Sequence, residues 1–216
     1  MTYSNLIKQM LMASIDELSK TPEIYAVHPD KDFTRNRTIS FHDFLLLLTM
    51  EDDCLREELY HFFGRSAETP SKAAFYHQRV KLKDGALWEL LQIFNQKLKP
   101  TLYRNRYRLV ACDGSVADIF RDEKDTETYF EPNNKSPRGF NQIHINALYS
   151  ILDKRFLDVL VQPARKRNEY RAFCEMVDRV KDDYPTIYIA DRGYASYNDF
   201  AHVLEKQQYF LIRCTD

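Results

Sequence analysis

The chain has 216 residues, of which 44% are hydrophobic and 29% charged, a composition that excludes a largely disordered protein. Its formal net charge is -1, so the whole chain is not basic enough to indicate a nucleic-acid partner, and any such contact has to come from local patches. The four cysteines form no CxxC pair and are typical of a reducing, intracellular setting. The longest apolar run, 44–48, is far too short to span a membrane, and we expect a cytoplasmic protein.

Helices are predicted through the first hundred residues. Apolar side chains recur at helical spacing in five segments, which are 1–20, 41–48, 51–63, a helix with Ser71 as its N-cap, and 87–98. Pro22 follows the first of these segments and cannot continue it. The five segments predict a helical N-terminal domain over residues 1–100.

The pattern changes near residue 102, where short β-rich runs begin to alternate with helical segments. The predicted order is strand, strand, strand, helix, strand, helix, strand, over residues 107–112, 142–151, 156–161, 168–180, 186–190, 196–207 and 209–213. Asn168 and Ser196 are the expected N-caps of the two helices. This order predicts an α/β or α+β domain over residues 101–216.

Two aspartates occupy similar places in this pattern. Asp113 follows the strand-like run YRLVAC, and Asp191 follows the run TIYIA, which is typical of a fully buried strand. A glycine comes after each aspartate within two residues, although the chain has only five glycines. We expect each aspartate at the carboxyl end of its strand, where open α/β sheets bind ligands, and we expect the two strands to be neighbours.

Paired carboxylates at one edge of a sheet indicate a metal ion, because they repel each other unless a cation lies between them. Oxygen ligands without a His or Cys cluster favour Mg²⁺ or Mn²⁺ over zinc. Two such ions can activate an attacking oxygen and stabilise a leaving oxygen in phosphoryl transfer. The alternative at this point is that Asp113 and Asp191 are turn residues beside glycines.

Four sequence segments carry a family resemblance. The aspartates stand in ACDGS (111–115) and IADRGYAS (189–196), and the helical region contains DFTRNRTISFHDFLLLL (32–48) and SKAAFYHQRVKL (71–82). Together these segments resemble the DDE transposases of the insertion-sequence-4 type. The resemblance implies a ribonuclease H-like mixed sheet with flanking helices, in which Asp113 and Asp191 are the catalytic ligands of two Mg²⁺ (or Mn²⁺) ions.

The same resemblance implies an activity and its partners. The implied activity is cut-and-paste DNA transposition, in which metal-dependent phosphodiester cleavage is followed by strand transfer. The implied partners are transposon inverted-repeat ends and target DNA, held by a homodimer in the synaptic complex, with no membrane. The implied location is the bacterial cytoplasm, at the nucleoid.

The third acid of this family stands in a motif, Tyr-x2-Arg-x3-Glu-x6-Lys, after the second aspartate. The carboxylates that follow Asp191 are Asp199, Glu205 and Asp216, and none has both the tyrosine and the arginine at the required offsets. We therefore expect that the chain lacks the third acid, that its ribonuclease H-like domain is truncated, and that it is inactive by itself.

Several other side chains are candidates for DNA contact. They are Arg35, Arg37, Lys72, Gln78, Arg79, Arg192 and Tyr194. The helix after Ser71 would act as a recognition helix, and Arg192 would neutralise a scissile phosphate. The alternative for the charged residues among them is an ordinary solvated surface. His144, in the strand beside the proposed site, is expected to be a hydrogen-bonded residue and not a catalytic one.

Two other functions stay open on the sequence. The first is a non-catalytic DNA-binding remnant that occupies transposon ends or inhibits a full-length transposase, and the missing third acid favours it. The second is another Mg²⁺-dependent nuclease on an α/β sheet. The helical first domain argues against this nuclease, and so does the lack of a Gly-rich phosphate loop in the sequence.

Overall fold

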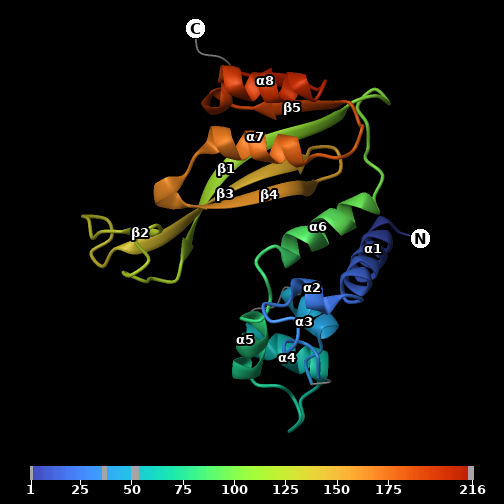
Figure 1. The fold of residues 1–216 in the computed structure, drawn as a ribbon, viewed down its shortest axis with the longest axis vertical. Helices are drawn as coiled ribbons and strands as arrows, with labels where there is room; N and C mark the ends of the chain where they lie inside the picture. The colour runs from blue at the N-terminus through green and yellow to red at the C-terminus, as the bar shows by residue number, and fades with distance from the viewer. Residues whose placement is uncertain (1, 36–37, 50–53, 214–216) are drawn as a thin grey trace. The chain divides into compact units, whose positions relative to one another are not determined.

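The chain forms two compact units, Met1–Leu98 and Lys99–Asp216. The structure is a computed structural model and describes residues 2–35, 38–49 and 54–213. Helices make up the first unit, and the second contains a sheet with helices, as the blue-to-green and green-to-red parts of Figure 1 show. The division lies close to the predicted boundary at residue 100.

The first unit contains the predicted helices and one more. They are α1 (Tyr3–Leu18), α2 (Pro22–Tyr25), α3 (Phe41–Leu48), α4 (Leu55–Phe63), α5 (Lys72–Arg79) and α6 (Ala86–Gln96). Ser71 caps α5 as predicted, because its hydroxyl oxygen accepts a hydrogen bond from the Ala74 amide. Helix α1 ends at Leu18, before Pro22, and Pro22 begins the short α2, since the missing N–H of proline costs nothing in a first helical turn.

Helix α3 is the centre of the first unit because it is apolar on two sides. Phe41 and Leu45 pack with side chains of α1 and α6 in one hydrophobic cluster. Phe44 and Leu47 pack in a second cluster with side chains of α4 and α5. A helix that buries two faces needs the nearly unbroken apolar run found here.

The second unit is built on one mixed sheet of six strands. The strands are β1 (Arg108–Ile119), β2 (Tyr129–Phe130), β3 (Phe140–Ser150), β4 (Arg155–Pro163), β5 (Thr186–Ala190) and β6 (Tyr209–Ile212). Strand β3 pairs antiparallel with β1, β2 and β4, whereas β5 pairs parallel with β1 and β6. The predicted strands and helices appear in the predicted order, with the short strand β2 as an unpredicted addition, and the antiparallel-then-parallel sheet is consistent with a ribonuclease H-like fold.

The helices of the second unit are α7 (Glu169–Arg179) and α8 (Tyr197–Glu205), with short 3-10 helices η1 (Ala164–Lys166) and η2 (Arg192–Tyr194). Helix α7 covers one face of the sheet (Figure 1), where Phe173 and Val177 pack on Val110 and Leu148. Asn168 and Ser196 cap α7 and α8, as predicted.

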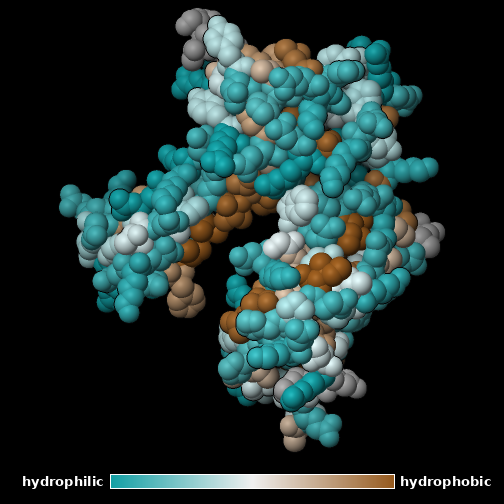
Figure 2. Space-filling model, viewed as in Figure 1, coloured by the Kyte–Doolittle hydropathy of each residue, from teal (hydrophilic) through white to brown (hydrophobic). Residues whose placement is uncertain are grey.

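Helix α7 covers the more polar of the two faces of β3. The buried side chains of this strand include His144 and Asn146, whereas Ile143 and Ile145 on the opposite face are only half-buried. A hydrophobic band along the sheet of the second unit is visible below α7 in Figure 2. Polar groups beneath α7 need hydrogen-bond partners, and these partners hold the start of that helix.

The prediction that Asp113 ends its strand is wrong. Strand β1 continues through Asp113 to Ile119, and Gly114 pairs with Asn146 of β3 in the same ladder. The exposed residues of this extension look like a turn in the sequence, because the DGS stretch has low β propensity. The long partner β3 overrides that propensity by providing backbone hydrogen bonds along the whole extension.

No helix in the described part of the chain is long and apolar enough to cross a membrane.

Candidate active site

Asp113 and Asp191 both follow the paired residues of two neighbouring parallel strands. The register of β1 and β5 pairs Ala111 with Ile189, and each aspartate follows two residues later in the chain, Asp113 within β1 and Asp191 directly after β5. Both aspartates are exposed. The prediction that the two strands are neighbours is confirmed, and both aspartates lie just beyond the last residue pair between β1 and β5.

The two aspartates are held differently. Asp113 lies within β1, and its Oδ1 accepts a hydrogen bond of 2.8 Å from the amide of Gly114. Asp191 is the N-cap of η2, and its Oδ1 accepts a hydrogen bond of 2.8 Å from the amide of Gly193. A Cβ at Gly193 would lie 2.9 Å from that oxygen, so the glycine makes room for the capping carboxylate.

The lack of a side chain at Gly114 leaves space for the ring of His144, and the backbone makes no turn there. A Cβ on this residue would lie 2.5 Å from Cε1 of His144, which is closer than real Cβ atoms come. His144 is only 2% exposed, and its ring lies against the backbone of the residue that follows Asp113. Gly114 is therefore explained by the close approach of His144, whereas the turn of the alternative interpretation is absent because β1 continues through this residue.

Glu169 lies beside Gly114, a position that the sequence did not indicate. It is the first residue of α7, and its Oε1 lies 3.0 Å from Nε2 of His144. The same oxygen would lie 3.3 Å from a Cβ at Gly114. The predicted N-cap at Asn168 indicates that Glu169 is the first residue of the helix. Only the fold shows which strand lies next to this end of the helix.

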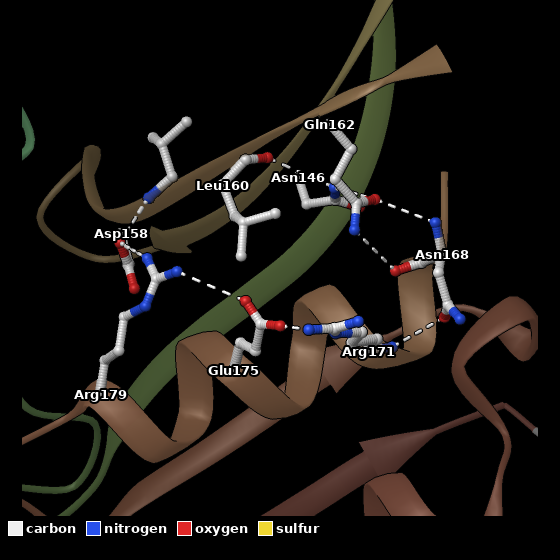
Figure 3. Close-up of polar contacts among 9 residues, drawn as sticks. Asn146, Asp158, Leu160, Gln162, Asn168, Arg171, Glu175 and Arg179 are labelled. Atoms are coloured by element: carbon white, nitrogen blue, oxygen red, sulfur yellow. Dashed lines mark hydrogen bonds and ion pairs between the residues drawn. The ribbon is translucent and has the colours of Figure 1, made fainter. Parts of the chain in front are cut away.

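Hydrogen bonds fix the start of α7 on the sheet (Figure 3). The Asn168 amide donates to Oε1 of Gln162 at 3.0 Å, and the Gln162 side chain donates to the Asn168 carbonyl at 3.4 Å. Asn146, buried in β3, donates to the same Gln162 oxygen and to the Leu160 carbonyl, each at 3.3 Å. These contacts hold the first turn of α7, and with it Glu169, at a fixed position relative to β3 and β4.

Comparison with known proteins identifies the family. A family model described as "Transposase DDE domain" matches residues 104–215, which includes both aspartates. The chain belongs to the DDE transposase family. Such enzymes are polynucleotidyl transferases, and they generally use divalent metal ions. No curated protein matches the chain significantly.

A structural comparison finds similarity to a transposase described as "Drosophila P element transposase strand transfer complex". The two chains are 8% identical, with a TM-score of 0.40. The similarity covers 90% of this chain and 46% of that one, so this DDE transposase chain spans about half the length of the P element protein.

The residues of this DDE transposase fit a hard divalent cation as far as their chemistry goes. Asp113 and Asp191 offer exposed carboxylate oxygens on adjacent strands, the donor type that Mg²⁺ and Mn²⁺ prefer. Across 2–35, 38–49 and 54–213, no three His, Cys, Asp or Glu side chains are arranged so that they could hold one ion. The described residues thus offer two carboxylates to a metal ion, but no arranged set of three or more such ligands.

Two core residues near the aspartates in the chain, Cys112 and Tyr194, have raised pKa values. Burial raises the pKa of the Cys112 thiol to about 12, and the negative charge of Asp113 adds to this effect. Burial likewise raises the pKa of Tyr194, whose ring packs against Phe173 with 5.7 Å between ring centroids. At neutral pH both groups keep their protons.

The structure separates the predicted DNA-contacting residues into exposed and buried ones. Arg35, Lys72, Arg79 and Arg192 are exposed, and Arg37 lies outside the described residues. The prediction of DNA contact is corrected for Tyr194 and Gln78, which are 2% and 7% exposed. Side chains this deeply buried have too little free surface to reach a base edge or a phosphate.

Gln78 instead lines a cavity of about 590 Å³ in the first unit. Its Oε1 accepts a hydrogen bond of 3.0 Å from Nζ of Lys81, which lines the same cavity with Lys31 and Arg35. Of the predicted contacts in the helical unit, the fold therefore brings Arg35 and Gln78 to one concave place. Lys72 and Arg79, on α5, do not line it.

Proposed function

We propose that this chain forms the helical region and catalytic core of a DDE transposase of the insertion-sequence-4 type. The proposed reaction is cleavage of DNA at inverted-repeat ends, followed by attack of the freed 3′-hydroxyl on target DNA, in a homodimeric complex. The observation that supports the proposal is the parallel pairing of β1 and β5, the two strands of the DDE domain that Asp113 and Asp191 follow or belong to.

Asp113 and Asp191 are the proposed metal ligands and the proposed catalytic residues. When bound, two Mg²⁺ ions supply activation of the attacking oxygen and charge stabilisation of the leaving oxygen. Arg192, exposed and next to Asp191 in the chain, is proposed to neutralise the scissile phosphate with its guanidinium. Arg35, Lys72 and Arg79 are proposed to contact the DNA backbone, which positions a protein without selecting sequence.

The residues after Asp191 do not contain the Tyr-x2-Arg-x3-Glu-x6-Lys motif. Residues 1–216 therefore contain two of the three acids expected of a DDE site. This observation also favours the second candidate function, which is occupation of transposon ends without cleavage. The two candidates differ in whether DNA is cut, and not in whether it is bound.

The test is excision of the element from a plasmid that carries the gene with its natural flanking DNA. Excision that is lost in Asp113→Asn and Asp191→Asn but kept in Asp118→Asn, an exposed acid of the same strand, supports the transposase. Binding of the purified chain to the flanking repeats without any excision supports the second candidate. Excision that survives both substitutions contradicts the catalytic assignment.

A further inference from the structure

The cavity of about 590 Å³ in the first unit gathers three cationic side chains, which are Lys31, Arg35 and Lys81. Among the residues that the structure describes, none of these three side chains forms an ion pair. Asp30 also lines the cavity, so the cations outnumber the acids of its described lining three to one. Such a surplus of positive charge in a concave place favours an anionic ligand.

Lys81 has neutral partners although it is half-buried. Its Nζ donates a hydrogen bond of 3.0 Å to Oε1 of Gln78 and lies 6.0 Å from the ring centroid of Phe33. Gln78 is 7% exposed, and its amide nitrogen contacts the Ile39 carbonyl at 3.5 Å, so the acceptor of Lys81 is itself held in place. An ammonium group has three donors, and one that has lost part of its hydration gains free energy from a nearby anion.

The loop that carries the other two cations has a defined backbone conformation. The His28 carbonyl accepts hydrogen bonds from the amides of Lys31 and Asp32, and the buried Asp32 carboxylate accepts one of 3.0 Å from the His28 amide. The Thr34 hydroxyl donates to the Lys31 carbonyl at 3.1 Å. Phe33 has a φ of 57°, in the left-handed region that bulky residues rarely adopt. Strain of this kind persists where the surrounding structure fixes the backbone, as it does around ligand sites.

The cavity also has an apolar part, formed by Phe33, Ile39 and Phe41. Phe33 is half-buried, whereas Ile39 and Phe41 are only 3% and 6% exposed. A volume of about 590 Å³ is that of a site for an organic molecule and is too large for a phosphate group alone. The ligand that fits both parts of the lining has an anionic group and an apolar or aromatic group, which packs well against a phenyl ring.

We propose that this cavity binds a phosphate ester, whose phosphate oxygens contact Lys31, Arg35 and Lys81 and whose organic group packs against Phe33. Lysine and arginine are the side chains that bind phosphate oxygens in proteins. The inference does not rest on the proposed function, because it concerns a ligand site of the first unit and not the cleavage of DNA. A phosphate ester of this chemistry comes either from a bound DNA strand or from a free small molecule.

The experiment is isothermal titration calorimetry of the full 216-residue chain with phenyl phosphate, and with inorganic phosphate for comparison. The variants are Arg35→Ala and Lys81→Met, which keeps most of the apolar stem of the lysine but loses its charge. Lys8→Ala is the matched control, because Lys8 is an exposed cation of α1 that does not line the cavity. Circular dichroism checks that each variant is folded, and Arg35→Ala decides alone if Lys81→Met is not.

Phenyl phosphate is expected to bind the wild type more tightly than inorganic phosphate does. Arg35→Ala and Lys81→Met are each expected to weaken its binding by about tenfold, since a hydrogen bond to a charged group is lost. Lys8→Ala is expected to bind like the wild type, and Asp30→Asn more tightly, because it removes a negative charge from the lining. Three results overturn the proposal: no binding at millimolar phenyl phosphate, binding that the variants of Arg35 and Lys81 leave unchanged, or equal affinity for the two ligands.

A competition experiment distinguishes the two sources of the phosphate. Short duplex DNA is added to the chain saturated with phenyl phosphate, and the calorimetric titration is repeated. Displacement of phenyl phosphate by the duplex supports the proposal with a DNA strand as the source. Unchanged binding of phenyl phosphate to the chain that already holds the duplex supports it with a free small molecule as the source. Neither result depends on whether Asp113 and Asp191 bind a metal ion.

Discussion

Asp113 and Asp191 each follow by two residues the last pair between two parallel strands, Ala111 with Ile189, although Asp113 lies inside its strand and Asp191 caps a 3-10 helix. The asymmetry follows from the partners of each strand. Strand β1 is continued past Asp113 by pairing with β3, whereas β5 has no such partner beyond Ala190 among the described residues. The carboxylate pair is thus created where one strand stops and its neighbour goes on.

The first prediction concerns repulsion within this pair. Asp113→Asn or Asp191→Asn removes one of two like charges on adjacent strands, and each is expected to stabilise the chain by about 0.2–1 kcal/mol at low salt without divalent ions. Addition of Mn²⁺ is expected to raise the melting temperature of the wild type but not of either variant. Thermal unfolding with and without Mn²⁺ measures both effects. Asp118→Asn is the control, and an equal Mn²⁺ response in all four proteins would count against a metal site at this pair.

The second prediction concerns Gly114. Gly114→Ala places a Cβ about where the ring of His144 lies, and overpacking of this kind is expected to destabilise the second unit by about 1–3 kcal/mol. Gly85→Ala is the control, because nothing lies within 4 Å of a Cβ there. Urea unfolding of both variants measures the difference. A Gly114→Ala protein as stable as the wild type would mean that His144 moves aside freely and that its close approach to Gly114 is not a constraint on the fold.

Much of the fold was predictable because its signals are local. The stripe from Phe41 to Leu48, the run TIYIA and the caps Asn168 and Ser196 each follow from spacing within a few residues, and all appear as predicted. The sequence also predicted that β1 and β5 would be neighbours, because a strand-hairpin-helix-strand path fits in the 78 residues that separate Asp113 from Asp191.

The errors come from interactions between distant segments. Strand β1 runs past Asp113 because β3 pairs with it, and no local pattern at DGS shows that partner. Gln78 and Tyr194 are polar or amphipathic residues that the tertiary fold buries. Glu169 looks like an ordinary first-turn acid of a helix, and only the close approach of His144 to Gly114 relates it to Asp113. The residues around the candidate site were therefore harder to predict than its two aspartates.

The third prediction concerns DNA binding by the helical unit. Replacement of Arg35, Lys72 and Arg79 together by alanine is expected to weaken binding to duplex DNA and to reduce its salt dependence. The slope of log K against log salt should fall by about 0.9 for each phosphate that the variant no longer neutralises. Gel-shift titrations at several salt concentrations measure the slope. Lys8→Ala, which removes an exposed charge of α1, is the control, and a triple variant with an unchanged slope would show that these three side chains bind no phosphate.

The last prediction concerns Asp199, which is fully buried in α8 and accepts a hydrogen bond from the Cys174 thiol. Burial raises the pKa of this carboxyl above its ordinary value of 3.8, so the folded protein keeps the proton at pH values where the unfolded chain has already lost it. The contribution of Asp199 to stability is therefore present below the ordinary pKa and is lost as pH rises through the raised one.

The asparagine in Asp199→Asn cannot ionise, so this variant does not lose stability through ionisation at position 199. Its free energy of unfolding relative to that of the wild type should therefore increase as pH rises from about 4 through the raised pKa of Asp199. Urea unfolding of both proteins at a series of pH values gives this difference directly, because all other groups titrate in both proteins and their contributions cancel. The exposed Asp118→Asn variant should show no such trend. If the difference between wild type and Asp199→Asn is constant across the series, Asp199 does not change its ionisation on folding, and the raised pKa inferred from its burial is wrong.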